Sequence, residues 1–240
     1  MPGSDIIFMI TRWIKFVWRY LRWAILGFLV FSVVGVITYS FIRPPFTFLM
    51  FSRVIEQVSN DKKPKIKHDW VSLDEISPNL VLAAVAAEDN NFTTHFGVDF
   101  EAIKKAQQYN ERKKGRRIRG ASTITQQTCK NVFLWSSRSY IRKGFELYFT
   151  FLVETVWSKK RIMEMYLNMI EMGDGIYGAE AASQAYFKKP AKNLTKREAA
   201  LIVAAFPNPR KYKVNNPGSY LQRRQQKILL LMRNIETVEL

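Results

Sequence analysis

Residues Trp23–Ile42 form a run of twenty without a charged side chain. A helix of that length rises about 30 Å, which is roughly the thickness of the hydrocarbon core of a bilayer. The alternative is a cleaved signal peptide, whose apolar core is typically about 7–15 residues long and ends in a small-residue cleavage site. Here the sequence Arg43-Pro44-Pro45 follows instead. The run therefore predicts a retained transmembrane helix over residues 23–42.

The charges around this run predict its orientation. Residues 1–22 contain Arg12, Lys15, Arg19 and Arg22, with only Asp5 opposing them. This bias favours a single-pass chain with its N-terminus in the cytoplasm and residues 43–240 outside. Lysines and arginines also follow the run, so the bias is imperfect. Cys129 is the only cysteine, so the outer part forms no internal disulfide.

Helical rather than strand-like periodicity runs through the remainder. Over about 139–157, for example, apolar residues recur at helical spacing, and no alternation is long enough to build a sheet. We expect a cytoplasmic basic segment (1–22), the transmembrane helix (23–42), a neck broken by prolines (43–72) and one all-α domain (73–240). The expected helix starts carry capping residues. These are Ser77, Asp99, either Ser122 or Thr123 (the latter able to form a capping box with Gln126), and Thr195 with Glu198.

The formal net charge is +17. Such an excess attracts nucleic acid, anionic lipid headgroups or phosphorylated substrates, and a membrane tether favours the last two. Eight basic residues concentrate in one stretch, with Glu101 and Glu111 opposing them. They are Lys104, Lys105, Arg112, Lys113, Lys114, Arg116, Arg117 and Arg119. This stretch is either a solvated loop or a surface on membrane lipid; it lacks the interleaved aromatic residues of a nucleic-acid site.

Glu88 and Asp89 end an apolar stretch that includes Val81, Ala84 and Val85. A carboxylate projecting from such a stripe into a partly desolvated cleft has a raised pKa, as a general base needs. The alternative is two solvated acids at a helix end. His95 could carry a proton, but a histidine among aromatic residues more often holds a neighbouring loop, and we favour that interpretation.

Two further clusters carry polar groups. Gly120–Asn131 places hydroxyls and amides at a helix N-terminus, where they can donate to a phosphate or sugar, with Lys130 adding a charge. Arg142 and Glu146 are i,i+4 neighbours, either a surface ion pair or, with Lys143, part of a cleft that meets a diphosphate. With only two histidines and one cysteine, no metal cage is visible.

Taken in order, these clusters resemble the motifs of the peptidoglycan glycosyltransferase family. Glu88-Asp89-x-x-Phe92-x-x-His95-x-Gly97-x-Asp99 is similar to the first motif, and Gly120-x-Ser122-Thr123-Ile124-Thr125-Gln126-Gln127 with Lys130-Asn131 to the second. Arg142-Lys143-x-x-Glu146 is similar to the third, and residues 159–178 to the fourth and fifth. The resemblance covers about residues 70–235. It is nearest to the monofunctional biosynthetic transglycosylases, because the chain ends where a transpeptidase domain would follow.

The resemblance implies a lysozyme-like helical fold and the polymerisation of lipid II into glycan strands. It implies Glu88 as the general base and Glu146 as a second carboxylate that helps to place the donor diphosphate, through a divalent cation (Mg or Mn) or through its basic neighbours. It also implies a location in the bacterial cytoplasmic (inner) membrane. The substrate-binding residues it implies are Asp89, Phe92, His95, Ser122, Thr123, Gln126, Lys130, Asn131, Arg142 and Lys143.

Two other functions stay open at this point: a lysozyme-like lytic enzyme, which would cleave peptidoglycan, and a membrane-tethered scaffold that binds anionic lipid. The partners expected for the synthetic enzyme are lipid II, the growing strand and membrane lipid, with cell-wall synthesis or division proteins as candidates and no nucleic acid.

Overall fold

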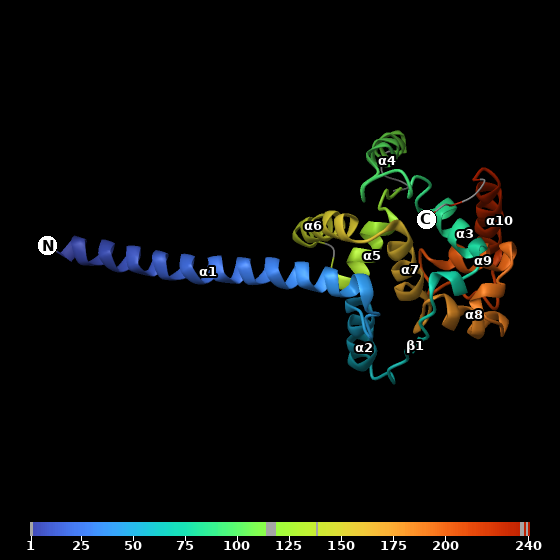
Figure 1. The fold of residues 1–240 in the computed structure, drawn as a ribbon, viewed down its shortest axis with the longest axis horizontal. Coiled ribbons are helices and arrows are strands. Elements are labelled where there is room, and N and C mark those ends of the chain that lie inside the picture. The colour runs from blue at the N-terminus through green and yellow to red at the C-terminus, as the bar shows by residue number, and fades with distance from the viewer. Residues whose placement is uncertain (1, 114–118, 138, 236–237, 239) are drawn as a thin grey trace. The chain divides into compact units, whose positions relative to one another are not determined.

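The computed structural model describes residues 2–113, 119–137, 139–235, 238 and 240, and it divides the chain into two compact units, Met1–Ile42 and Arg43–Leu240. The first unit is the helix α1 (Pro2–Phe41), seen in blue in Figure 1. Its part from Thr11 to Phe41 is long and apolar enough to cross a bilayer. The uncharged run thus lies in one long helix, which also includes the basic segment before it.

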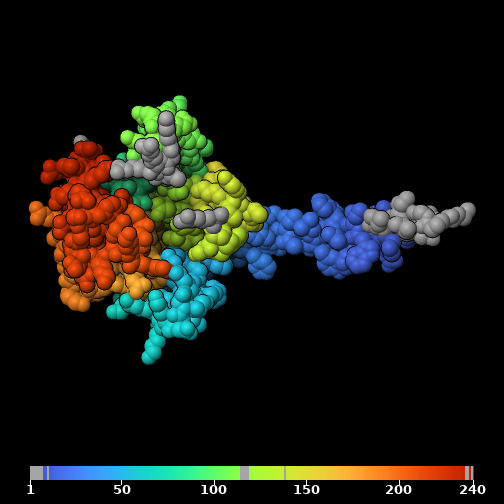
Figure 2. Space-filling model, turned by 180° about the vertical axis from the view of Figure 1, so that it is seen from behind, coloured from blue at the N-terminus to red at the C-terminus, as the bar shows by residue number. Residues whose placement is uncertain are grey.

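The second unit is mostly helical, so the expected all-α class is confirmed. Its α-helices are α2 (Phe48–Ser59), α3 (Pro78–Glu88), α4 (Phe100–Arg112), α5 (Ile124–Phe133), α6 (Tyr140–Val156), α7 (Lys159–Met169), α8 (Ala179–Phe187), α9 (Lys196–Ala205) and α10 (Ser219–Arg233). Two short 3-10 helices, η1 (Leu73–Glu75) and η2 (Ala191–Asn193), join them. In the space-filling view α4 (green) projects at one edge of this unit and α2 (cyan) at another (Figure 2).

The expected helix starts are confirmed. Ser77 accepts a hydrogen bond from the backbone of Asn79, and Asp99 accepts one from Ala102. Thr123 and Gln126 form a capping box at α5, as Thr195 and Glu198 do at α9. These caps satisfy backbone N–H groups that the first turn of a helix leaves without a partner.

One small sheet was not expected. β1 (Lys67–His68) pairs in parallel with β3 (Ile176–Tyr177), and β3 pairs in antiparallel with β2 (Glu171–Gly173). The expectation that no sheet forms is therefore wrong, because strands of two or three residues are too short to leave an alternation in the sequence. Residues 43–72, expected as a neck, contain α2 and β1 and belong to the second unit.

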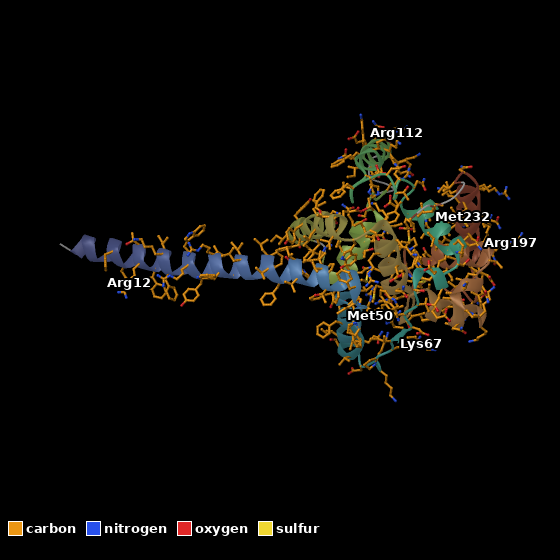
Figure 3. The ribbon with its side chains drawn as sticks, viewed as in Figure 1. Arg12, Met50, Lys67, Arg112, Arg197 and Met232 are labelled. Atoms are coloured by element: carbon orange, nitrogen blue, oxygen red, sulfur yellow. The ribbon has the colours of Figure 1, made fainter. Side chains whose placement is uncertain are left out.

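The core of the second unit has two groups of helices. α3 and α10 pack on α9, and α5 packs against both α6 and α7. Met50 of α2, labelled in Figure 3, is fully buried, as are Leu80 of α3 and Val203 of α9. The C-terminal end of α3 contacts both groups, since Glu88 hydrogen-bonds to Gln127 of α5 and to Arg224 of α10. This junction brings the polar clusters of the sequence together.

Candidate functional site

Glu88 is the last residue of α3, and its side chain is 18% exposed. Gln127 Nε2 donates to its Oε2 over 3.1 Å, and Arg224 Nη2 donates to its Oε1 over 3.3 Å. Tyr166 Oη, buried in α7, lies 3.4 Å from Gln127 Oε1 and donates to it. The carboxylate therefore ends a chain of hydrogen bonds from the protein interior and keeps part of its surface open.

Burial raises the pKa of Glu88, and the hydrogen bond from Gln127 and the charges of Arg224 and Lys130 oppose this change. Desolvation disfavours the ionised carboxylate, whereas nearby cations favour it. Because desolvation prevails, Glu88 is more basic than an ordinary glutamate. The interpretation of a solvated acid at a helix end is thus not supported for Glu88.

Asp89 differs from its neighbour, because its carboxylate is enclosed. His95 Nε2 lies 2.9 Å from Oδ1 and 3.0 Å from Oδ2, and the backbone N–H of Ile124 donates to Oδ2 over 2.9 Å. Phe92 is fully buried beside them, with Lys159 Nζ 4.7 Å from the centre of its ring. Three expected substrate-binding residues, Asp89, Phe92 and His95, therefore lie behind the surface and attach the loop after α3 to the start of α5.

The N-terminus of α5 also contains both buried residues and an exposed one. Thr123 and Gln126 are buried, and their side chains form the capping box; the Thr123 hydroxyl also donates to the carbonyl oxygen of Gly97 over 2.6 Å. Ser122 is exposed, and Asn131 is buried further along α5. Gly97 has the expected positive φ, +76°. Of Ser122, Thr123 and Gln126, Ser122 is the one that is exposed to a ligand.

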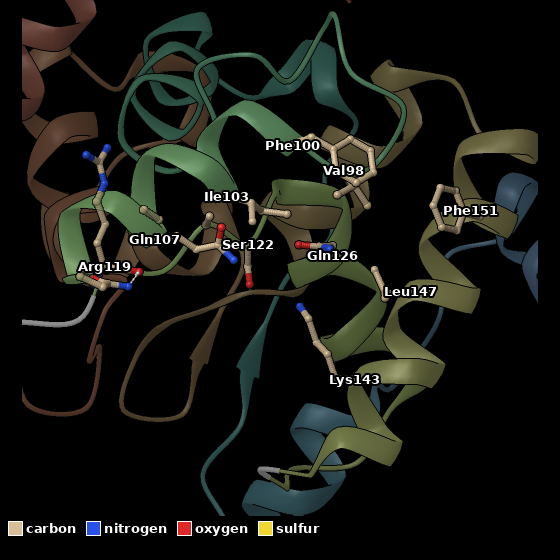
Figure 4. Close-up of a pocket in the computed structure, with 13 residues that line it drawn as sticks. Val98, Phe100, Ile103, Gln107, Arg119, Ser122, Gln126, Lys143, Leu147 and Phe151 are labelled. Atoms are coloured by element: carbon tan, nitrogen blue, oxygen red, sulfur yellow. Dashed lines mark hydrogen bonds between the residues drawn. The ribbon is translucent and has the colours of Figure 1, made fainter. Parts of the chain in front are cut away.

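A cavity of about 570 Å³ lies beside this helix start. Side chains of Ser122, Gln126 and Lys143 point toward the same space in Figure 4. The rest of its lining is largely apolar and comes from α4, α6 and the segments before α4 and α5. Those residues include Val98, Phe100, Ile103, Ala106, Ala121, Leu147 and Phe151. The cavity thus has polar groups where α5 and α6 meet, and a mostly apolar remainder to which Gln107 and Asn110 of α4 and Arg119 add further polar groups. Glu88 is not among its lining residues.

Glu146 of α6 is the second carboxylate, with 3% of its side chain exposed. Arg142 Nη1 donates to Oε2 over 2.5 Å, and Lys143 Nζ donates to Oε1. Lys130 is exposed, and the charges of both Glu146 and Glu88 act on it. Partial desolvation lowers the pKa of Lys130, and the charges of Arg142 and Lys143 lower it further. The charges of Glu146 and Glu88 raise it. Lys130, Arg142 and Lys143 therefore form a cluster of cations around one buried anion.

The basic stretch of residues 104–119 is only partly described. Lys105 pairs with Glu101 at 3.0 Å on the exposed surface of α4, and the backbone of Arg119 is bonded to the side chain of Asn110. Lys114, Arg116 and Arg117 lie outside the described residues.

The residues around Glu146 do not fit a resident metal ion. Both carboxylate oxygens already accept from cations, and the described part of the chain has no group of three or more histidine, cysteine, aspartate or glutamate side chains that could hold an ion. A divalent cation takes most of its ligands from oxygen atoms such as carboxylates. The positive charge that the protein itself supplies here is that of lysine and arginine.

Arg224 was missed by the sequence analysis. It belongs to α10, 136 residues after Glu88, and no motif spacing connects them. The sequence does hold one signal, because Arg224 lies three residues after Leu221 and four before Ile228, within the apolar stripe of the helix. Gln127 belongs to the second motif, but its place there does not predict its contact with Glu88.

The chain is similar to known proteins over most of its length. Residues 53–233 match the model of the family described as Transglycosylase. A biosynthetic peptidoglycan transglycosylase of Bacteroides thetaiotaomicron is 50% identical over 219 residues, 91% of this chain and 88% of the relative. Proteins of the same name from Shewanella oneidensis and Escherichia coli are 48% and 49% identical, over 95% and 91% of this chain and 97% and 90% of the relatives.

Proposed function

The chain belongs to the transglycosylase family and is a peptidoglycan glycosyltransferase, and we propose that it polymerises lipid II with Glu88 as the general base. The observation that carries this role is the position of the carboxylate. It is mostly buried at a helix end and has a raised pKa, and the charge of Lys130 acts both on it and on Glu146. A carboxylate with a raised pKa and a partly open surface is suited to act as a general base that deprotonates a sugar hydroxyl near neutral pH.

In the proposed reaction Glu88 takes the proton from the 4-hydroxyl of the N-acetylglucosamine of the acceptor lipid II. The hydroxyl oxygen attacks C1 of the N-acetylmuramic acid at the reducing end of the donor strand. The bond from C1 to the diphosphate oxygen breaks, and its electron pair leaves with undecaprenyl diphosphate. Because the attack comes from the face opposite the α-linked leaving group, the configuration inverts and a β-1,4 bond forms.

The cluster of Lys130, Arg142 and Lys143 supports a role at the leaving group. Negative charge grows on the diphosphate as the bond breaks, and fixed cations in a partly desolvated site stabilise it. Loss of one such group commonly raises a barrier by about 3 kcal/mol. Glu146 holds two of these cations in place, so its role is to position them.

Glu88→Gln tests the base. It keeps the side chain's shape and a hydrogen-bonding oxygen but removes the proton acceptor. We expect the full-length variant in detergent to form no polymer from labelled lipid II while its helical content stays that of the wild type. Glu101→Gln is the control, since the side chain of Glu101 is 76% exposed on α4. Undiminished polymerisation by Glu88→Gln would refute the assignment.

The same assay separates the other candidate functions. A lytic enzyme would release muropeptides from purified sacculi and make no polymer, and a scaffold would do neither while binding anionic vesicles. For Glu146→Gln we expect a large loss of rate with lipid II still bound. A requirement for Mg or Mn stays a prediction, and rates of wild type and Glu146→Gln across a titration with each ion would test it.

For the membrane topology we propose a cytoplasmic N-terminus and an external second unit. The uncharged run within α1 and the basic residues before it support this orientation. A reporter enzyme active only outside the cytoplasm should be active when fused after Leu240. Activity of a cytoplasm-specific reporter at the same position would contradict the proposal.

A further inference from the structure

Arg224 interrupts the apolar stripe of α10. Leu221, Ile228 and Met232 are buried along this stripe, and α10 packs on α3 and α9. Arg224 lies on the same face, three residues after Leu221, with its side chain 27% exposed. Arginine is seldom found in such a position without a partner that requires its charge.

The stability of the fold does not account for this arginine. Among the described residues its one contact with an acid is the 3.3 Å bond from Nη2 to Glu88, and an isolated pair that is partly exposed contributes at most about 1 kcal/mol. Its Nε is buried and has no hydrogen-bond partner among the described residues. An unsatisfied buried donor costs about 1–3 kcal/mol. The polar contacts of Arg224 therefore give the fold little net stability.

The contact restrains the carboxylate of Glu88. Arg224 binds Oε1 from α10 while Gln127 binds Oε2 from α5, so the carboxylate is held from two sides by different helices. With only one of these contacts the carboxylate could rotate about its terminal bond. With both, its plane is fixed, and so is the direction in which its free lone pairs point.

We propose that Arg224 is a positioning residue that orients the Glu88 carboxylate and keeps it ionised for proton transfer. This inference rests on the proposed role of Glu88 as the general base. Arg224 acts on Glu88 and needs no contact with the sugars.

The other groups that face Glu88 determine how large the effect is. Lys130 of α5 also favours the ionised form, while Asp89, the next residue along the chain, disfavours it. Tyr166 of α7 is neutral, because burial raises the pKa of its phenol. Removing Arg224 therefore leaves Lys130 as the cation that acts on the base within the described part of the chain. We expect a graded loss of activity, concentrated at acidic pH.

The experiment compares full-length Arg224→Gln, Arg224→Lys and Arg223→Gln in lipid II polymerisation, from mildly acidic to mildly alkaline pH. Arg223→Gln is the matched control, because it removes the same charge from the adjacent, exposed position of α10. Wild type and Glu88→Gln are measured in the same series. Thermal unfolding of each variant reports whether the fold is affected.

For Arg224→Gln we expect a lower kcat and an acidic limb of the pH profile that moves to higher pH. The ratio of alkaline to acidic rates should rise roughly threefold or more, which corresponds to about half a pKa unit. Arg224→Lys should restore part of this ratio, Arg223→Gln should match the wild type, and Arg224→Gln should unfold at the wild-type temperature or above.

An Arg224→Gln enzyme with the wild-type rate and profile would overturn the inference while leaving the proposed function intact. A fall in rate that accompanies a lower unfolding temperature, with the profile unchanged, would also overturn it, because that result indicates a purely structural role. Polymerisation by Glu88→Gln would instead refute the proposed base itself.

Discussion

Gly97 packs so closely against α6 that a side chain at this position should destabilise the fold. Its φ is +76°, and an added Cβ would lie 2.5 Å from Thr150 Cγ2 and 2.9 Å from Glu154 Cγ, both on α6. Neither neighbour can move freely. Thr150 is fully buried, and the Glu154 carboxylate is held by Lys159 at 2.8 Å and Thr125 at 2.6 Å. Gly97→Ala should therefore strain the loop that follows α3.

The magnitude follows from two costs. Placing a residue that has a side chain in the left-handed region costs about 1–2 kcal/mol of conformational free energy. Inserting a carbon atom into a packed site costs about 1–3 kcal/mol. We expect Gly97→Ala to lower the free energy of unfolding by about 2–5 kcal/mol. For a unit of this size each kcal/mol shifts the unfolding temperature by about 2–4 °C, so the decrease should be about 4–20 °C.

Gly144 is the matched control for the same substitution. It is exposed within α6, and an added Cβ would meet no atom within 4 Å. There alanine should stabilise the helix by about 0.5–1 kcal/mol and raise the unfolding temperature by about 1–4 °C. Thermal unfolding of full-length protein in detergent, followed by near-ultraviolet circular dichroism, measures both. Shifts of the same sign, or no shift for Gly97→Ala, would refute the reasoning.

Three further predictions concern buried groups. Burial raises the pKa of the Cys129 thiol, so it should react far more slowly with thiol reagents in the native protein than in urea; rapid native labelling would contradict this. Arg53→Met leaves the buried Glu171 carboxylate without its 3.0 Å partner and, because Arg53 is partly exposed, should cost up to about 3 kcal/mol by thermal unfolding. Adding Glu171→Gln should recover most of that loss, and no recovery would argue against the pair. Burial raises the pKa of folded Glu88 above its ordinary value of 4.5, so the wild type loses stability as pH rises from that value through the raised pKa. Glu88→Gln should unfold at a higher temperature than the wild type at neutral pH and at a similar one in acid, and lower stability at neutral pH would contradict the argument.

The features predicted from the sequence depend on residues that are close together in it. Ser77, Asp99 and Thr123 cap helices by accepting from backbone groups two or three residues ahead. Gly97 adopts a positive φ, and the uncharged run lies within a single helix. A local pattern is enough for each because local geometry determines the outcome.

Long-range features could not be predicted in this way. The sheet joins residues 67–68 to residues 171–177 through strands too short to leave a periodic pattern. The contact of Arg224 with Glu88 depends on how α10 packs on α3, and sequence spacing does not determine that packing. The first motif also does not distinguish a residue that meets a ligand from one that supports it. Burial separates the two kinds, because Phe92 is fully enclosed and Glu88 is not.

The different roles of the adjacent acids Glu88 and Asp89 affect how a genetic screen of these positions should be interpreted. Asp89 accepts from His95 and from the first backbone N–H of α5, so it anchors the peptide that carries Glu88. A mutational screen scored by cell growth would rank the two positions as equally intolerant, although only one is proposed to handle a proton. Second-site suppressors should distinguish them, since a lost anchor can be replaced elsewhere in the loop and a lost base has no nearby substitute.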